Sequence, residues 1–166
     1  TVAANNATRA YGAANPAFTG TVTGAQGNDT FTESFSTPAT ATSAVGTYPI
    51  VPSVTGANLA NYTVTIVNGA LTVTAAPTTT TLTAPATAAY GASVTLSATV
   101  TSAAGVPTGS VTFYSGTKSL GVSALNMSGV ATLTLTTLDG GANPVTAAYA
   151  ATGNLAASTS PGTSVT

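Results

Sequence analysis

Short apolar runs in this sequence alternate with Thr or Ser, and Gly, Pro and Asn interrupt them every few residues. Residues 93–101 are the plainest case, because the even positions are Val, Leu, Ala and Val while every odd position is Ser or Thr. Successive side chains of a strand point to opposite faces, so a period of two predicts a strand with one buried face. Helical periodicity is absent nearly everywhere. The sequence therefore predicts an all-β fold of short strands.

The second half of the chain is predicted to be a seven-stranded immunoglobulin-like β-sandwich. Its strands are expected at residues 79–84, 93–101, 109–114, 119–125, 130–137, 144–150 and 158–166. The alternating apolar positions of four of these strands form the predicted core: Val94, Leu96, Ala98, Val100, Val111, Phe113, Leu133, Leu135, Val145, Ala147 and Tyr149. The chain has no Cys or Trp, so this sandwich must close on aliphatic packing rather than on a disulfide.

The first half is predicted to be a small, mostly antiparallel β domain. Its strands are expected at residues 17–23, 29–36 and 46–54, with a hairpin within residues 61–75. Pro49 and Pro52 mark an edge or an irregular stretch of the third strand, because proline cannot donate to a ladder. Residues 37–44 are predicted to be a loop.

The hairpin is predicted from Asn68 and Gly69, which both tolerate the positive φ of a type I′ turn. A two-residue loop there sets the register of the flanking strands and places three apolar pairs on one face: Ile66 with Leu71, Val64 with Val73, and Tyr62 with Ala75. Threonine pairs occupy the opposite face. The apolar face is the one that we expect to be buried.

The composition changes at residues 75–81 (AAPTTTT), where Pro77 interrupts the pattern before a new strand begins. We therefore predict two domains, residues 1–76 and 77–166. Two domains also suit a length of 166 residues.

Only five residues carry a charge at neutral pH, and the chain has no His. These five are Arg9, Asp29, Glu33, Lys118 and Asp139. Acid–base, nucleophilic and metal chemistry draw mainly on the missing groups, so we expect no enzyme activity, no cofactor and no metal site. A net charge of -1 disfavours nucleic acid and anionic lipid as partners. No apolar run is long enough to predict a transmembrane segment, and any targeting signal is expected upstream of residue 1.

The charged residues suggest two candidate sites, each with a simpler alternative. Asp29 and Glu33 are about 13 Å apart on a predicted strand, too far for one metal ion, so a solvated face or a contact with Arg9 is the favoured interpretation. Lys118 is the only lysine and could form an isopeptide crosslink. Its place near a predicted turn favours a solvated charge instead.

Carbohydrate could be attached to the chain or bound by it. Four Asn-x-Ser/Thr sequons are candidate glycosylation sites, although such sequons arise easily in a Thr-rich chain: Asn6, Asn28, Asn61 and Asn126. Four aromatic residues could form a platform for a sugar, but the favoured interpretation is a small core: Tyr11, Phe18, Tyr48 and Tyr62.

An ordered set of motifs in residues 5–76 closely resembles the bacterial MBG domain of the YG-x type. The motifs are Tyr11-Gly12, Asn15-Pro16, Phe18-Thr19, Gly27-Asn28-Asp29-Thr30, Val45-Gly46-Thr47-Tyr48-Pro49-Ile50, Asn61-Tyr62 and Gly69-Ala70-Leu71-Thr72-Val73. The fourth of these motifs reads Gly-Asn-Asp-Thr, whereas the family more often has Asn-Gly-Asp-Thr.

The second half resembles the bacterial Ig-like repeats of the Big family. The matching motifs are GASVTLSATV at residues 91–100, PTGSVTF at 107–113, Leu120-Gly121, GVATL at 129–133, and TAAY at 146–149. The frequent Tyr-x-Gly-Asp ending is replaced by a segment without an acidic residue. Both families occur as tandem modules in long secreted or surface-attached bacterial proteins. The resemblance therefore implies an extracellular or cell-surface location in an adhesin, stalk or fibre, and it carries no catalytic motif.

The two ends of the chain resemble its middle, which leads to a hypothesis about assembly. Residues 1–4 and 162–166 both echo the segment LTVTAA at residues 71–76. We expect one repeat of an array, or a subunit that contacts identical copies head to tail. The predicted junction consists of Thr1, Val2, Ala3, Ala4, Ala75, Ala76, Pro77, Val165 and Thr166. The alternative is a binding module whose loop ends recognise glycan or a host ligand.

Overall fold

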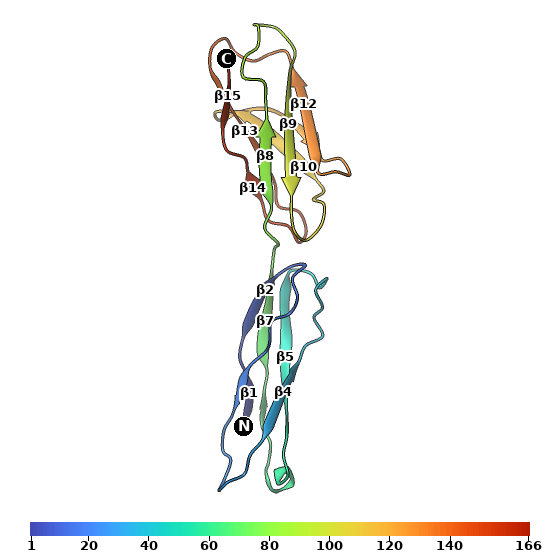
Figure 1. Cartoon of the computed structure of the whole chain (residues 1–166), viewed down its shortest axis with the longest axis vertical. Coiled ribbons are helices and arrows are strands. Elements are labelled where there is room, and N and C mark those ends of the chain that lie inside the picture. Colours follow the sequence, from blue (N-terminus) through green and yellow to red (C-terminus); the bar gives the residue numbers. More distant parts are fainter. The chain divides into compact units, whose positions relative to one another are not determined.

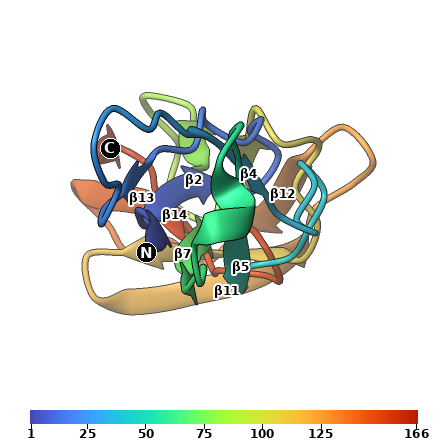
Figure 2. The same ribbon diagram turned by 90° about the horizontal axis from the view of Figure 1, so that it is seen from below.

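The computed structural model describes all 166 residues, which form two compact units, Thr1–Thr74 (unit 1) and Ala75–Thr166 (unit 2) (Figure 1). Every element is a strand except one turn of 3-10 helix, η1 (Leu59–Asn61), which is the short green coil in Figure 2. The predicted all-β fold of two tandem domains is confirmed. The units divide after residue 74, two positions before the predicted boundary.

Unit 1 consists of two sheets. Its strands are β1 (Val2–Ala4), β2 (Ala7–Ala10), β3 (Gly20–Val22), β4 (Thr32–Ser36), β5 (Gly46–Thr55), β6 (Ile66–Val67) and β7 (Gly69–Thr74). The smaller sheet has the order β3-β1-β6, and the larger has the order β2-β7-β5-β4. The sequence did not predict β1 or β2, because these strands are only three and four residues long and lack a clear alternation.

The first and last strands of unit 1 run parallel in a single register. Val2 pairs with Ile66 in the smaller sheet and Ala10 pairs with Thr74 in the larger, so the partner is 64 positions later in both sheets. Between the sheets, the Oδ1 atom of Asn6 accepts a hydrogen bond of 2.8 Å from the backbone N–H of Ala70, in the same register. The segments formed by residues 2–10 and 66–74 therefore pass together from the smaller sheet to the larger sheet.

The predicted hairpin at Asn68 and Gly69 is wrong. β6 pairs with β1, β7 pairs with β2 and β5, and neither Asn68 nor Gly69 has the positive φ that a type I′ turn requires. A Cβ on Gly69 would lie 2.5 Å from the carbonyl oxygen of Asn5, so glycine is needed for a close approach of two chain segments. Ile66, which the hairpin would bury, is 45% exposed.

The prolines of β5 lie where the strand has only one neighbour. Residues 46–50 pair with β7, and residues 51–55 pair with β4. Each half of β5 thus has a free side, which is where strands tolerate Pro49 and Pro52. The core beneath this sheet is small and centres on Ile50, Leu71 and Val73. Residues 37–44 contain no helix, as predicted.

Unit 2 is a sandwich of two sheets. Its strands are β8 (Thr79–Thr83), β9 (Val94–Thr101), β10 (Ser110–Ser115), β11 (Lys118–Ala124), β12 (Val130–Leu135), β13 (Asn143–Tyr149), β14 (Ser158–Thr159) and β15 (Thr163–Val165). One sheet has the order β12-β9-β8, and the other has β11-β10-β13-β14, with β15 also paired to β13. The predicted seventh strand is divided in two, because Pro161 and Gly162 interrupt its pairing with β13.

The core of unit 2 follows the alternation of the sequence. The even positions of β9, the odd positions of β13, and Val111 and Phe113 of β10 are buried. Leu133 is the one predicted core residue that is only partly buried. Tyr149 is among the largest fully buried side chains, and its hydroxyl donates a hydrogen bond of 3.0 Å to the carbonyl of Thr108. One aromatic ring thereby anchors a sandwich that has no disulfide.

We expect the substitution Gly69→Ala to destabilise unit 1 by about 1 to 3 kcal/mol, because the new Cβ meets backbone atoms that cannot rotate away. The midpoint of urea unfolding measures this loss. Gly140→Ala is the control, since a Cβ at Gly140 meets nothing within 4 Å. Equal midpoints for the two variants would contradict the crossing described here.

Candidate functional site

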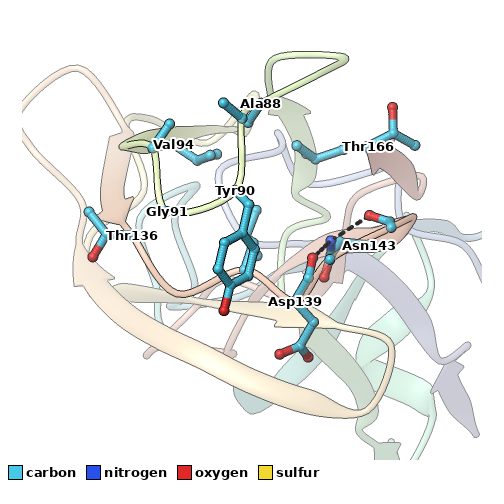
Figure 3. Close-up of a pocket in the computed structure, with 14 residues that line it drawn as sticks. Ala88, Tyr90, Gly91, Val94, Thr136, Asp139, Asn143 and Thr166 are labelled. Carbon is cyan, nitrogen blue, oxygen red and sulfur yellow. Dashed lines mark hydrogen bonds between the residues drawn. The ribbon is translucent and has the colours of Figure 1, made fainter.

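A pocket lies at the end of unit 2 where the chain reaches Thr166 (Figure 3). It encloses about 90 Å³, and its lining comes from residues 88–94, residues 136–143 and the last two residues of the chain. Val94, Leu138 and Val165 supply apolar surface, and Tyr90, Asp139 and Asn143 supply the polar groups.

Backbone and amide hydrogen bonds shape this pocket. The N–H of Ala88 donates to the carbonyl of Thr166 at 2.8 Å, and the N–H of Thr166 donates to the carbonyl of Ala86 at 3.0 Å. Asn143 is 5% exposed, and its Nδ2 donates to the carbonyls of Asp139 and Gly141 (Figure 3). Because both sides of the pocket are tied to strand ends, its shape is set by the sandwich.

The mouth of the pocket carries an aromatic ring and a carboxylate. Tyr90 is 88% exposed, which is unusual for a large apolar side chain. The carboxylate of Asp139 lies 3.4 Å from the Nζ of Lys118, and both side chains are mostly exposed. The pair as a whole carries no net charge.

Lys118 begins β11 at the surface, with Asp139 as its ion-pair partner. The structure thus places the only lysine in an exposed position, in keeping with a solvated charge.

A second polar cluster lies in unit 1, around Asp29. Its Oδ1 accepts a hydrogen bond from the Nδ2 of Asn58, and its Oδ2 accepts one from the hydroxyl of Tyr62, both at 2.6 Å. Tyr62 also packs edge-on against Phe31, with ring centroids 5.1 Å apart. The Tyr62 hydrogen bond, followed by that of Asn58, lowers the pKa of Asp29, and the bond to Asp29 raises the pKa of Tyr62.

The contact of Arg9 with Asp29 or Glu33 does not form. Arg9 is 6% exposed, and its Nε donates to the Oδ1 of Asn15 at 2.7 Å. Its other nitrogens donate to the carbonyls of Ala10, Thr40 and Ala41. The guanidinium is therefore satisfied by neutral oxygens and fastens residues 40–41 to β2, while Glu33 lies exposed on β4.

The four aromatic residues of the predicted platform do not come together. Tyr11, Phe18 and Tyr48 pack against the core of unit 1, as the favoured interpretation held. Tyr62 belongs to the Asp29 cluster instead. The sequence reasoning missed Tyr90, although its isolated place in AAYGA, outside any alternating run, is a usable signal of an exposed ring.

All four sequon asparagines are exposed: Asn6, Asn28, Asn61 and Asn126. Two of them also have structural roles, because Asn6 bonds to β7 and the Oδ1 of Asn126 accepts hydrogen bonds from the N–H groups of Ser128 and Val130. Glycosylation at any of the four remains a prediction.

The predicted junction residues lie in ordered backbone. The amino group of Thr1 donates a hydrogen bond to the carbonyl of Thr23, and Val2, Ala3 and Ala4 form β1. Ala75 to Pro77 leads into unit 2, where the N–H of Ala76 donates to Asn154 and the carbonyl of Pro77 accepts from Ser102. Val165 is buried, and Thr166 bonds to Ala86. Whether these segments join neighbouring copies remains a prediction.

No three His, Cys, Asp or Glu side chains come together anywhere in the chain, and no helix in the structure is long and apolar enough to cross a membrane. The strands and the two compact units define the class of this protein, which is a two-domain all-β module.

Comparison with known families agrees with the motifs of the sequence. Residues 79–166 match the family described as "Bacterial Ig-like domain (group 3)", and residues 1–72 match the "MBG domain (YGX type)". The chain therefore belongs to the bacterial Ig-like domain family, and an MBG domain precedes its Ig-like domain. Both domains are typical of bacterial surface proteins.

Comparison with individual proteins is less informative. Among curated proteins, none matches the chain. A solved structure from Corynebacterium diphtheriae, described as a membrane anchored protein, aligns with 74% of the chain at 16% identity and a TM-score of 0.40. The chain spans 31% of the length of that protein.

We expect the hydrogen bond from Tyr62 to Asp29 to stabilise unit 1 only at pH values between the pKa of Asp29 and the pKa of Tyr62. The pKa of Asp29 is lower in the folded state than its value of about 3.9 in the unfolded state. The resulting stabilisation is present at pH values above the unfolded pKa and is lost as the pH falls through the folded pKa. The raised pKa of Tyr62 gives stability that is present below about 10 and is lost as the pH rises through the folded value.

Urea unfolding of the wild type and Tyr62→Phe across the pH range tests this expectation. The difference in unfolding free energy should be level near neutrality and should shrink toward both extremes. Tyr48→Phe is the control, because its hydroxyl donates to the carbonyl of Ala44 and not to an acid, so its effect should persist at acid pH. A Tyr62→Phe effect that did not change with pH would rule out the bond.

Proposed function

We propose that this chain is a structural module of an extracellular bacterial fibre, stalk or adhesin, in which identical copies or neighbouring modules follow one another end to end. The observation that carries the proposal is the direction of the first and last strands in unit 1. Because β2 runs parallel to β7, the chain enters the unit at one end and leaves it at the other. Modules with this topology extend when joined in series.

Unit 2 has the same directional property at its start. The bridge between Ala76 and Leu155 is parallel, and Leu155 lies on the segment that leads toward β14 and β15. The segment that enters unit 2 at Ala76 therefore runs in the same direction as the segment that leads to the end of unit 2.

The scarcity of charge also supports an exposed location. Trypsin-like proteases cleave after Lys or Arg, and the chain has two such residues. One of them, Arg9, is buried and held by its hydrogen bonds. The module therefore offers few sites to trypsin-like proteases.

Electron microscopy of the native material, together with its intact mass under denaturing conditions, tests this function. We expect filaments with an axial repeat of about 70 to 100 Å for two sandwiches in series. A very large denatured mass would indicate a covalent array, and a mass near the 15.8 kDa of this chain would indicate a polymer of subunits. Isolated monomers on the cell surface or in the medium would overturn the proposal.

The pocket at Tyr90 favours a second candidate, the binding of a neutral glycan. An exposed aromatic ring can stack on the apolar face of a sugar, and the Asp139 carboxylate can accept hydrogen bonds from its hydroxyls. The neutral Lys118–Asp139 pair disfavours strongly charged ligands.

A glycan array followed by titration of the best ligand tests this candidate. We expect Tyr90→Ala to weaken binding about tenfold, the value of one aromatic contact. Met127→Ala is the matched control, because Met127 is 96% exposed and does not line the pocket. Failure of every glycan to bind, or equal binding by both variants, would reject the site.

A further inference from the structure

We propose that the parallel terminal strands of unit 1 form a clamp that bears tension along the chain. This inference rests on the proposed function, because only a module in series is pulled from its two ends. It adds a mechanical role to a module that would otherwise act only as a spacer.

The clamp consists of two segments in one constant register, residues 2–10 and residues 66–74, whose backbones pair at residues 2–3 and again at residues 7–10. Further hydrogen bonds lie just beyond its two ends. The N–H of Val2 donates to the carbonyl of Thr65 at 2.9 Å, and the N–H of Tyr11 donates to the carbonyl of Thr74 at 2.8 Å. At the crossing between the sheets, Asn6 replaces a backbone partner for Ala70.

The direction of the strands decides how force reaches these bonds. Tension pulls residue 1 and residue 74 in opposite directions, and these residues lie at opposite ends of the parallel pair. The two segments are then sheared past each other, so all the bonds between them share the load and must break together. If the same strands were pulled apart from adjacent ends, the bonds would break one after another.

The side chains oppose sliding as well. Leu71 and Val73 of β7 are fully buried in the core, and Arg9 of β2 is held by Asn15 and by the loop at Thr40. A slip of one residue would turn these side chains to the wrong face of the sheet. The clamp therefore has a single position.

The test compares two pulling directions on the same unit in the full chain. The protein has no Cys, so attachment points can be introduced in pairs. Thr1→Cys with Thr72→Cys loads the clamp in shear, and Thr1→Cys with Thr65→Cys peels β1 from β6 at their adjacent ends. All three positions are exposed. Single-molecule force spectroscopy should give a several-fold higher unfolding force in shear, with equal urea midpoints for both variants.

A pair of neighbouring asparagines supplies a matched control. Asn6→Ala removes the bond to Ala70 inside the clamp, so we expect it to lower the shear force and leave the peeling force unchanged. Asn5→Ala removes a bond to the Thr19 hydroxyl, which lies outside the clamp, and should leave the shear force unchanged.

Equal forces in the two directions, or equal effects of the two asparagine variants on the shear force, would overturn the clamp. These outcomes are independent of the filament experiment. A clamp that fails leaves the axial repeat of a fibre untouched, and a chain found only as monomers can still show the directional difference in force.

Discussion

The pairing of the first and last strands of unit 1 is the constraint on which that unit depends. β7 is the only strand that pairs with both β2 and β5, so it joins the start of the chain to the remainder of the larger sheet. Its Leu71 and Val73 also supply half of the four buried residues of the core cluster in this unit. Such a pairing closes a loop of more than sixty residues, whose entropy cost must be recovered by this small core and its hydrogen bonds.

The alternation of the sequence predicted unit 2 well and unit 1 less well, for a physical reason. In unit 2 the long strands are antiparallel and half-buried, so the period of two appears directly in β9 and β13. In unit 1 the strands are short, and the partner of β7 lies far back in the sequence. Asn68 and Gly69 have the composition of a turn, but the glycine serves the close passage of Asn5. Sequence alone does not distinguish these two uses of glycine.

The sequence predicts the polar sites only where the composition excludes a residue type altogether. The absence of His and Cys can be read from the composition, whereas the partners of Arg9 cannot. A lone arginine suggests a carboxylate partner, yet in a chain with three acidic residues the guanidinium is satisfied by Asn15 and backbone carbonyls. Neutral oxygens can satisfy a buried cation when several converge on it, because each bond is charge-assisted. That convergence depends on the fold of residues 39–41 and is invisible in the sequence.

Because the chain carries so few charges, its stability depends mainly on uncharged interactions. A surface of Thr, Ser and Ala forms few ion pairs, and the one salt bridge, Lys118 to Asp139, is exposed and worth little. Structure in both units is held mainly by backbone ladders, hydroxyl contacts such as Thr95 to Thr134, and small apolar cores. Ladders are largely insensitive to salt, whereas exposed ion pairs are screened. For the fibre or stalk module proposed above, stability that depends on ladders rather than on ion pairs is an advantage wherever the ionic strength varies.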